Sequence, residues 1–179
     1  MDLKELMARA RSQIGLPITY RLGGGVFTAD KHTCADAKGS SDCSSYACWA
    51  LGIDKLGDYP WLAKPGTKSG VRDDWYGTDD IWHDAVNLSM GLFEEVHPPE
   101  VATIGCVIVY PGRWTLGKAR PPGHVGIVSA TDGFGATKVI HCSSGNFKVL
   151  GHAVAETGPE VFLARDKTIY AWCANILRP

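Results

Sequence analysis

The order in which two hydrophobic periods follow each other is the feature that most limits the fold of this chain. In the first half, apolar residues recur at helical spacing, as in 2–13 and 41–52. From residue 104 onward they occur in short continuous runs bounded by Gly, Pro and Asp, which is typical of buried strands. These runs are 104–110, 124–130 and 138–142, with 161–164 and 168–173 as further candidates. Helices followed by an antiparallel meander predict an α+β fold with N-terminal helices packed on a central antiparallel sheet.

Length and charge narrow the classes of function. With 179 residues, the chain is expected to form a single domain, 1–179. Its 18 basic and 19 acidic residues give a formal net charge of −1, which does not favour binding to nucleic acid or anionic lipid. Residues 1–6 lack a basic segment followed by an apolar run, and no stretch is long enough to span a bilayer. We therefore expect synthesis in the cytosol without a signal peptide and no membrane insertion.

The stretch 41–52 predicts a short helix with a cysteine in its first turn. Ser41 and Asp42 are good N-cap residues, and Gly52 is a natural stop. One buried stripe is expected from Tyr46, Ala47, Ala50 and Leu51. The unpaired N–H groups and positive dipole of the first turn favour the thiolate of Cys43 and can stabilise an oxyanion. The alternative is an ordinary small buried cysteine.

Six cysteines occur in the chain, and without a secretory signal they are expected to be reduced thiols. Cys106 and Cys173 are expected in the core, and Cys142 on the sheet face opposite to its neighbour His141. A zinc site is an alternative, built from His32, Cys34, Cys43 and Cys48. Its spacings are irregular, so neither a metal nor another cofactor is expected.

The remaining N-terminal features are a capped helix, a glycine cluster and a long connection. Asp2 can cap the helix 2–13, and an extended run, 18–22, follows it. Gly23–Gly25 allows a sharp turn and a close backbone approach. Residues 53–78 have no clear periodicity and are either a binding loop or an irregular cover, and a helix is expected to start at 78–80. The loop 111–122 is rich in Pro, Gly, Arg and Lys.

Two histidines are expected to meet on the predicted hairpin formed by 124–130 and 137–142. A turn centred near 132–133 places His124 opposite residue 141 or 142, about 5 Å away between Cβ atoms, so His124 and His141 can touch. A thiol, an imidazole base and a third polar group that orients it form the constellation required for nucleophilic catalysis. His152 and Asn146 are reserve candidates for the orienting group.

Five motifs, in order, resemble the NlpC-type bacterial cell-wall cysteine peptidases. They are Ile14–Gly24, Asp42–Ser45, Ile104–Tyr110, Gly123–Val128 and Val139–His141. The resemblance implies a minimal papain-like fold, with Cys43 as nucleophile, His124 as general base and acid, and His141 as orienting residue. It also implies that Tyr20 reaches the oxyanion or substrate, and that Asp42 and Ser44 contact the amino-terminal end of the substrate. Ser45 and Cys106 depart from the family pattern, where glycine and aspartate are usual.

The resemblance implies a peptidoglycan hydrolase, a cysteine amidohydrolase or endopeptidase that cleaves stem-peptide amide bonds through an acyl-enzyme. The expected bond is the one after γ-D-glutamate. Without a signal or wall anchor, the chain resembles phage lysins or effectors delivered by a secretion system, which act on the cell wall after release or delivery. An immunity or delivery partner is then conceivable, but its identity is unknown.

Two alternatives remain open from the sequence. The same fold and chemistry can serve a deamidase or acyltransferase toxin that acts on a protein or lipid. A non-enzymatic binding module with a decayed site is the other alternative, and its thiol should show no unusual reactivity.

Overall fold

The computed structural model describes residues 1–54, 77–88, 91–97, 103–112 and 122–178. Within them, five helices accompany a six-stranded antiparallel sheet and a small two-stranded parallel sheet, so the predicted α+β class is confirmed. The loops predicted at 53–78 and 111–122 lie almost entirely outside the described residues. No helix in the described ranges combines the length and apolar character needed to cross a membrane.

The N-terminal helix forms as the sequence predicts. Helix α1 (Leu3–Arg11) begins after Asp2, whose Oδ1 accepts the backbone N–H of Glu5 at 2.7 Å. It ends two residues before the predicted end of the helix at 13. Strand β1 (Thr19–Tyr20) then pairs in parallel with β2 (Ser40–Ser41), which leads directly into the next helix.

Helix α2 (Cys43–Ala50) is buried on every side. All eight of its residues are buried, so the predicted single apolar stripe is wrong in extent. The reason is that α2 packs between α1 and strands β5 and β6, and the chain around β1 and β2 covers the rest. Gly52 follows with φ of 70° and donates its N–H to the carbonyl of Trp49, which confirms it as the stop.

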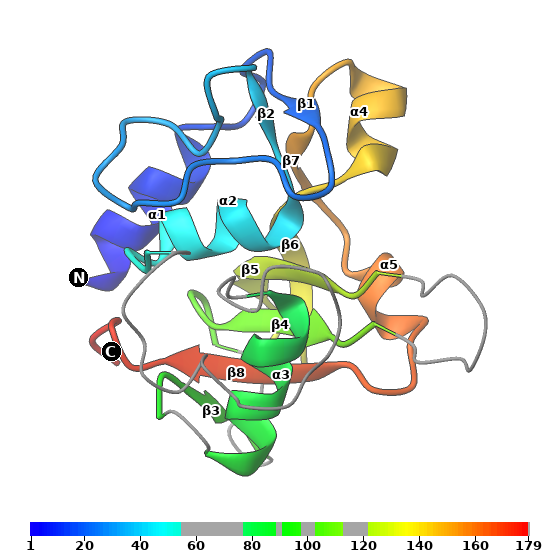
Figure 1. The fold of residues 1–179 in the computed structure, drawn as a ribbon. Coiled ribbons are helices and arrows are strands. Elements are labelled where there is room, and N and C mark those ends of the chain that lie inside the picture. The colour runs from blue at the N-terminus through cyan, green and yellow to red at the C-terminus, as the bar shows by residue number, and fades with distance from the viewer. Residues whose placement is uncertain (55–76, 89–90, 98–102, 113–121, 179) are drawn as a thin grey trace, which may run out of the picture.

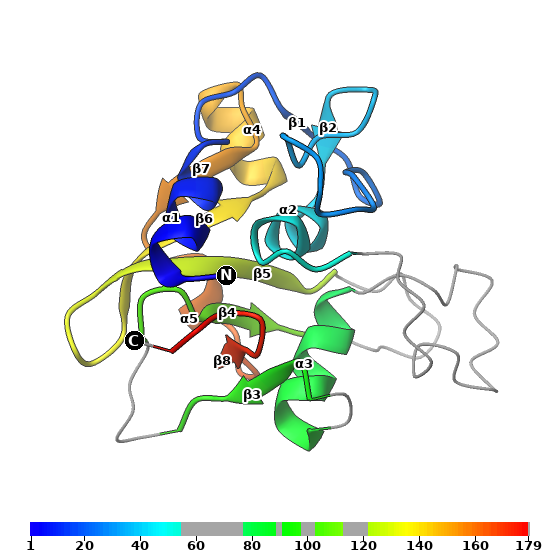
Figure 2. The same ribbon diagram turned by 90° about the vertical axis from the view of Figure 1, so that its left-hand side faces the viewer.

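The larger sheet has the strand order β3-β8-β4-β5-β6-β7. Its strands are β3 (Phe93–Glu95), β4 (Val107–Tyr110), β5 (His124–Thr131), β6 (Ala136–Cys142), β7 (Val154–Thr157) and β8 (Ile169–Cys173). Helix α3 (Thr78–Asn87) starts where the sequence predicts and packs on β3, β4 and β8. Figures 1 and 2 show α2 lying against the β5–β6 part of this sheet and α3 against its β3 end.

Three expectations for the second half need correction. The sheet is a meander only from β4 to β7, because β8 returns to lie between β4 and β3. The run 161–164 belongs to a helix, α5 (Glu160–Leu163), rather than a strand, because Pro159 precedes it at the N-cap and only Phe162 is buried. Strands β3 and β7 and helix α4 (Ser144–Leu150) are not predicted from the sequence.

The two chain ends lie side by side at one edge of the molecule (Figures 1 and 2). The amino group of Met1 donates to the carbonyl of Asn175 at 3.1 Å, and Leu177 N–H donates to the carbonyl of Met1. The parallel pair β1–β2 lies at the top of Figure 1, beside α4. The start of α2 therefore lies where the β1–β2 segment meets the first residues of β5.

Candidate functional site

The N-terminus of α2 is fixed by one carboxylate. Asp42 Oδ1 accepts the N–H of Ser45 at 2.8 Å and the hydroxyl of Ser44 at 3.0 Å. Its Oδ2 accepts the N–H of Gly23 at 2.8 Å. These bonds hold the glycine segment against the helix start, and both Asp42 and Ser44 are buried. The predicted contact of Asp42 and Ser44 with substrate stays a prediction.

The glycine cluster makes the close approach that the sequence predicts. A Cβ at Gly25, whose φ is +111°, would lie 2.3 Å from the Cβ of Ser45. The Ser45 hydroxyl donates to the carbonyl of Gly24 at 2.6 Å. Ser45 therefore ties α2 to this loop, and only glycine fits opposite it.

His124 and His141 are in direct contact. His124 Nε2 lies 2.7 Å from His141 Nδ1, and the two rings are nearly perpendicular, with an interplanar angle of 82°. Both side chains are buried, at 7 % and 3 % exposure. The structure thus brings together the two histidines that the hairpin pattern predicts.

The predicted register of the two histidines is wrong by one or two residues. Strands β5 and β6 pair Ile127 with Ile140, and continuing this register places Gly126 opposite His141. A Cβ at Gly126 would lie 3.1 Å from the Cβ of His141, in agreement with that position. His124 is therefore diagonal to His141 on the same sheet face. The reason is the turn: Thr131 pairs with Ala136, so the hairpin is centred between Gly133 and Phe134 rather than at 132–133, and the irregularity between Val128 and Ala130 is reversed at Thr131.

Cys43 lies at the beginning of β5. Its Sγ is 4.0 Å from the carbonyl oxygen of Gly123, the residue before His124. Cys43 is the first residue of α2, so by helix geometry its own N–H and that of Ser44 have no acceptor within the helix. Cys43 therefore lies beside the start of β5, the strand that carries His124, and His124 in turn contacts His141 of β6.

Thr157 extends the chain of hydrogen-bonded side chains that His124 and His141 form. His141 Nε2 lies 2.9 Å from Thr157 Oγ1, and the Thr157 hydroxyl donates to the carbonyl of Gly158 at 2.9 Å. Thr157 ends β7, the strand that pairs with β6. Sequence reasoning missed it because β7 is short and not predicted.

Two aromatic side chains enclose the histidine pair. Phe162 of α5 stacks on His124 with ring centroids 5.0 Å apart and an interplanar angle of 19°. Tyr110 pairs with His124 across β4 and β5, with ring centroids 6.1 Å apart. Gly126 leaves room for Phe162, because a Cβ there would lie 3.0 Å from Phe162 Cζ. Sequence reasoning missed Phe162 because its segment resembles a strand.

Burial keeps both histidines neutral. Desolvation, with a contribution from His141, lowers the pKa of His124 to about 3. Desolvation lowers the pKa of His141 to about 4. Since both values lie far below neutrality, each ring carries a single proton at pH 7.

Tyr20 lies close to the start of α2. Tyr20 pairs with Ser41, two residues before Cys43. Burial, together with the charges of Cys43 and Asp42, raises the pKa of Tyr20 well above its usual range. The phenol therefore keeps its proton and is able to donate a hydrogen bond, as the predicted oxyanion role requires.

The side chains of the two reserve candidates, Asn146 and His152, contact backbone carbonyl groups. Asn146 Nδ2 donates to the carbonyls of His141 and Ala153, and His152 Nδ1 contacts the carbonyl of Val154. None of these three hydrogen bonds joins Asn146 or His152 to the His124 ring. The ring that contacts His124 is that of His141, and its orienting role stays a prediction.

The other cysteines are buried, as expected for core thiols. Burial raises the pKa of Cys106 to about 12 and that of Cys173 to about 11. Among the described residues, no three His, Cys, Asp or Glu side chains are grouped so that they could hold a metal ion. The zinc alternative built on His32, Cys34, Cys43 and Cys48 therefore finds no support in their placement.

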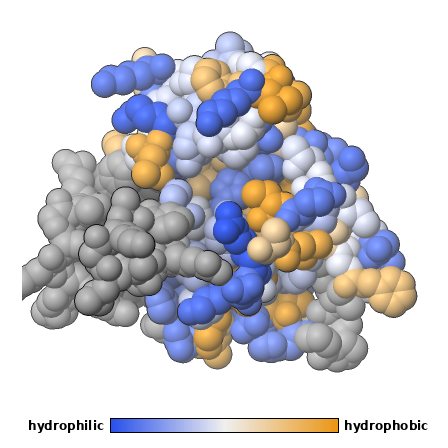
Figure 3. Space-filling view, turned by 90° about the vertical axis from the view of Figure 1, so that its right-hand side faces the viewer, coloured by the Kyte–Doolittle hydropathy of each residue, from blue (hydrophilic) through white to orange (hydrophobic). Residues whose placement is uncertain are grey.

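Surface features around the site are modest. On the face shown in Figure 3, hydrophobic residues gather in small separate groups among hydrophilic ones. Exposed apolar side chains on the helices next to the site are Phe147, Val149 and Leu150 of α4, and Val161 and Leu163 of α5. The last two flank Phe162 in sequence, so part of the surface next to the histidine pair is apolar.

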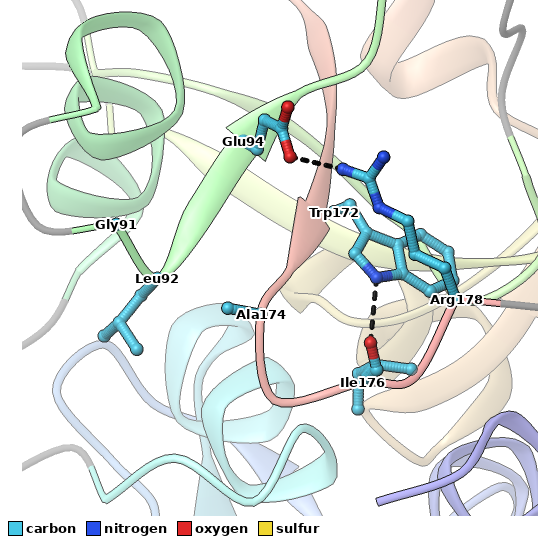
Figure 4. A pocket seen from close by; sticks show the side chains of 7 residues that line it. All are labelled: Gly91, Leu92, Glu94, Trp172, Ala174, Ile176 and Arg178. Carbon is cyan, nitrogen blue, oxygen red and sulfur yellow. Dashed lines mark hydrogen bonds and ion pairs between the residues drawn. The ribbon is translucent and has the colours of Figure 1, made fainter.

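A shallow pocket of about 200 Å³ lies elsewhere, at the β3–β8 edge of the sheet (Figure 4). Trp172 and Leu92 line it, and Arg178 pairs with Glu94 at its rim. The Trp172 indole N–H already donates to the carbonyl of Ile176 at 2.9 Å. Its carboxylate, Glu94, is paired with Arg178, and no thiol, hydroxyl or imidazole lines the pocket, so the chemistry points to the histidine pair instead.

Comparison with known proteins adds no assignment: no family model matches the chain, and no curated protein matches it significantly. The site is therefore argued from its own geometry.

Proposed function

We propose that the chain is a cysteine amidohydrolase of minimal papain-like fold that cleaves peptidoglycan stem peptides. The observation that carries the proposal is the convergence of Cys43, at the start of a capped helix, with a buried, hydrogen-bonded histidine pair. The stem peptide as substrate, and the bond after γ-D-glutamate, come from the resemblance of the motifs. Action on the cell wall after release or delivery belongs to the same proposal.

The first half of the reaction forms an acyl-enzyme. His124 takes the thiol proton of Cys43, and the thiolate attacks the amide carbonyl carbon. The oxyanion is stabilised by the first-turn N–H groups of α2 and by the Tyr20 hydroxyl. When the C–N bond breaks, His124 gives its proton to the leaving amine, and a thioester to Cys43 remains.

The second half consumes one water. His124 takes a proton from the water, the hydroxide attacks the thioester carbonyl, and the C–S bond breaks. The proton returns to the Cys43 sulfur, and the free carboxylic acid leaves. The low pKa of His124 makes neutral imidazole the resting base, and its cationic form is stabilised by the thiolate that its protonation creates.

Mass spectrometry of muropeptides after digestion of purified peptidoglycan tests this proposal. The expected result is a new amino terminus and a new carboxylate at one stem-peptide bond, both absent with Cys43→Ala. If muropeptides stay intact while Cys43 accepts an acyl group from another amide or ester, the substrate belongs to the deamidase or acyltransferase alternative. If no acylation of Cys43 occurs with any substrate class, the enzymatic proposal fails.

A further inference from the structure

We propose that Thr157 is a positioning residue that sets the tautomers of both histidines, so that His124 presents an unprotonated Nδ1 to Cys43. The catalytic consequence of this inference rests on the proposed function. The structural content of the inference rests only on the contacts of the histidine pair.

The carbonyl oxygen of Gly158 accepts hydrogen bonds and never donates them. The Thr157 hydroxyl lies 2.9 Å from the carbonyl oxygen of Gly158, so its single proton points there. The Thr157 oxygen then has only lone pairs to offer to His141 Nε2, 2.9 Å away. The proton of that contact must therefore be on His141 Nε2.

The proton on His141 Nε2 determines where the proton of His124 lies. A neutral His141 with its proton on Nε2 has a lone pair on Nδ1, and this atom lies 2.7 Å from His124 Nε2. His124 must supply the proton of that hydrogen bond. Because burial keeps His124 neutral, its Nδ1 carries no proton and is able to accept one.

The unprotonated Nδ1 of His124 is on the side of the ring nearer to the backbone, close to which Cys43 lies. In histidine, Nδ1 is the ring nitrogen nearer to the backbone. Cys43 Sγ lies 4.0 Å from the carbonyl of Gly123, next to the backbone of His124. The opposite tautomer pair would place an N–H on this side, and His124 would then be unable to take the thiol proton.

The position of Thr157 is determined by its strand. Thr157 pairs with Val139 and Ala155 pairs with His141, so Thr157 is diagonal to His141 on the same sheet face. Gly158 lies between β7 and the N-cap residue of α5, Pro159. The carbonyl that takes the Thr157 proton is thus fixed between two ordered elements.

The test compares Thr157→Val, which removes the hydroxyl at nearly constant shape, with Thr157→Ser, which restores it. We expect kcat on purified peptidoglycan to fall by roughly tenfold or more in Thr157→Val with little change in KM, the usual scale for loss of a supporting contact. Thr157→Ser should recover most of the rate. Thr131→Val is the matched control, because the Thr131 hydroxyl also donates to a glycine carbonyl, that of Gly135, at the far end of β5.

A second readout does not depend on the substrate. In ¹⁵N NMR of the histidine rings, the wild type should show both His124 and His141 protonated on Nε2, and Thr157→Val should shift this population. A wild-type spectrum with His141 protonated on Nδ1, or an unchanged spectrum and rate in Thr157→Val, would overturn the inference. Absence of peptidoglycan cleavage by the wild type would instead count against the proposed function alone.

Discussion

Lowering the pH from 8 to 5 should destabilise the fold, and the histidine pair should account for most of the loss near pH 5. In the folded state burial holds the pKa of His124 at about 3 and that of His141 at about 4. In the unfolded chain a histidine has a pKa of about 6.5. Below pH 6.5 the unfolded state therefore binds protons that the folded state cannot take, and the free energy of unfolding falls with pH.

The size of this destabilisation follows from the difference between the pH and the pKa of about 6.5 in the unfolded chain. At pH 5, about 1.5 units below 6.5, each histidine costs about 2 kcal/mol at about 1.36 kcal/mol per unit, so the pair costs about 4 kcal/mol. This value depends little on the folded pKa, because both histidines remain largely neutral in the folded state at pH 5. It is a large part of a typical domain stability of about 5–15 kcal/mol.

Urea unfolding followed by tryptophan fluorescence at pH 5, 6, 7 and 8 measures this loss. His124→Gln and His141→Gln should each remove about 2 kcal/mol of the difference between pH 8 and pH 5, whatever their effect at pH 8. His97→Gln is the control for loss of a histidine away from the pair, because that side chain is exposed. If His124→Gln and His141→Gln keep the wild-type pH dependence, the reasoning on buried neutral histidines is refuted.

Three further predictions concern single residues. Cys43→Ala should abolish turnover and leave the melting temperature nearly unchanged; retained hydrolysis would exclude Cys43 as the nucleophile. Tyr20→Phe should lower the initial rate by roughly 10²-fold, the scale for one lost oxyanion donor, and an unchanged rate would leave Tyr20 a packing residue. Gly126→Ala should lower the stability by about 1–3 kcal/mol in thermal unfolding and slow hydrolysis, because its Cβ would lie 2.4 Å from Val139 Cγ1. Gly145→Ala, whose Cβ meets nothing closer than 3.7 Å, is the matched control, and equal effects of the two alanines would contradict the packing argument.

Local patterns predict the parts of the fold that local interactions determine. The capped helix around Cys43 and the hairpin that carries His124 and His141 follow from cap residues, turn residues and apolar periods. The segment around Phe162 is misassigned because a short apolar run fits a strand or a buried helical turn equally well. Strand β7 has only four residues, Val154–Thr157, and too few apolar side chains to be noticed.

The sequence does not predict the contacts that depend on how strands pair in the sheet. Thr157 reaches His141 only because β7 pairs with β6 in one register, and no spacing in the chain encodes that register. Phe162 reaches His124 because Gly126 leaves space on the sheet face, which a sequence pattern does not reveal. The placement of Cys43 and of the two histidines was therefore predictable, whereas the groups that contact and enclose the histidines were not.

The most direct test of the central claim is the initial rate on purified peptidoglycan for four proteins: wild type, His124→Ala, His141→Ala and His141→Asn. His124→Ala removes the proton acceptor and should fall to the rate of Cys43→Ala. His141→Ala frees the His124 ring and should keep some activity, and His141→Asn should recover part of the loss because its amide oxygen accepts the same hydrogen bond. A chelator should leave the wild-type rate unchanged. An active His124→Ala with an inactive His141→Ala would reverse the roles, and a wild type stopped by chelator would contradict the thiol–histidine account.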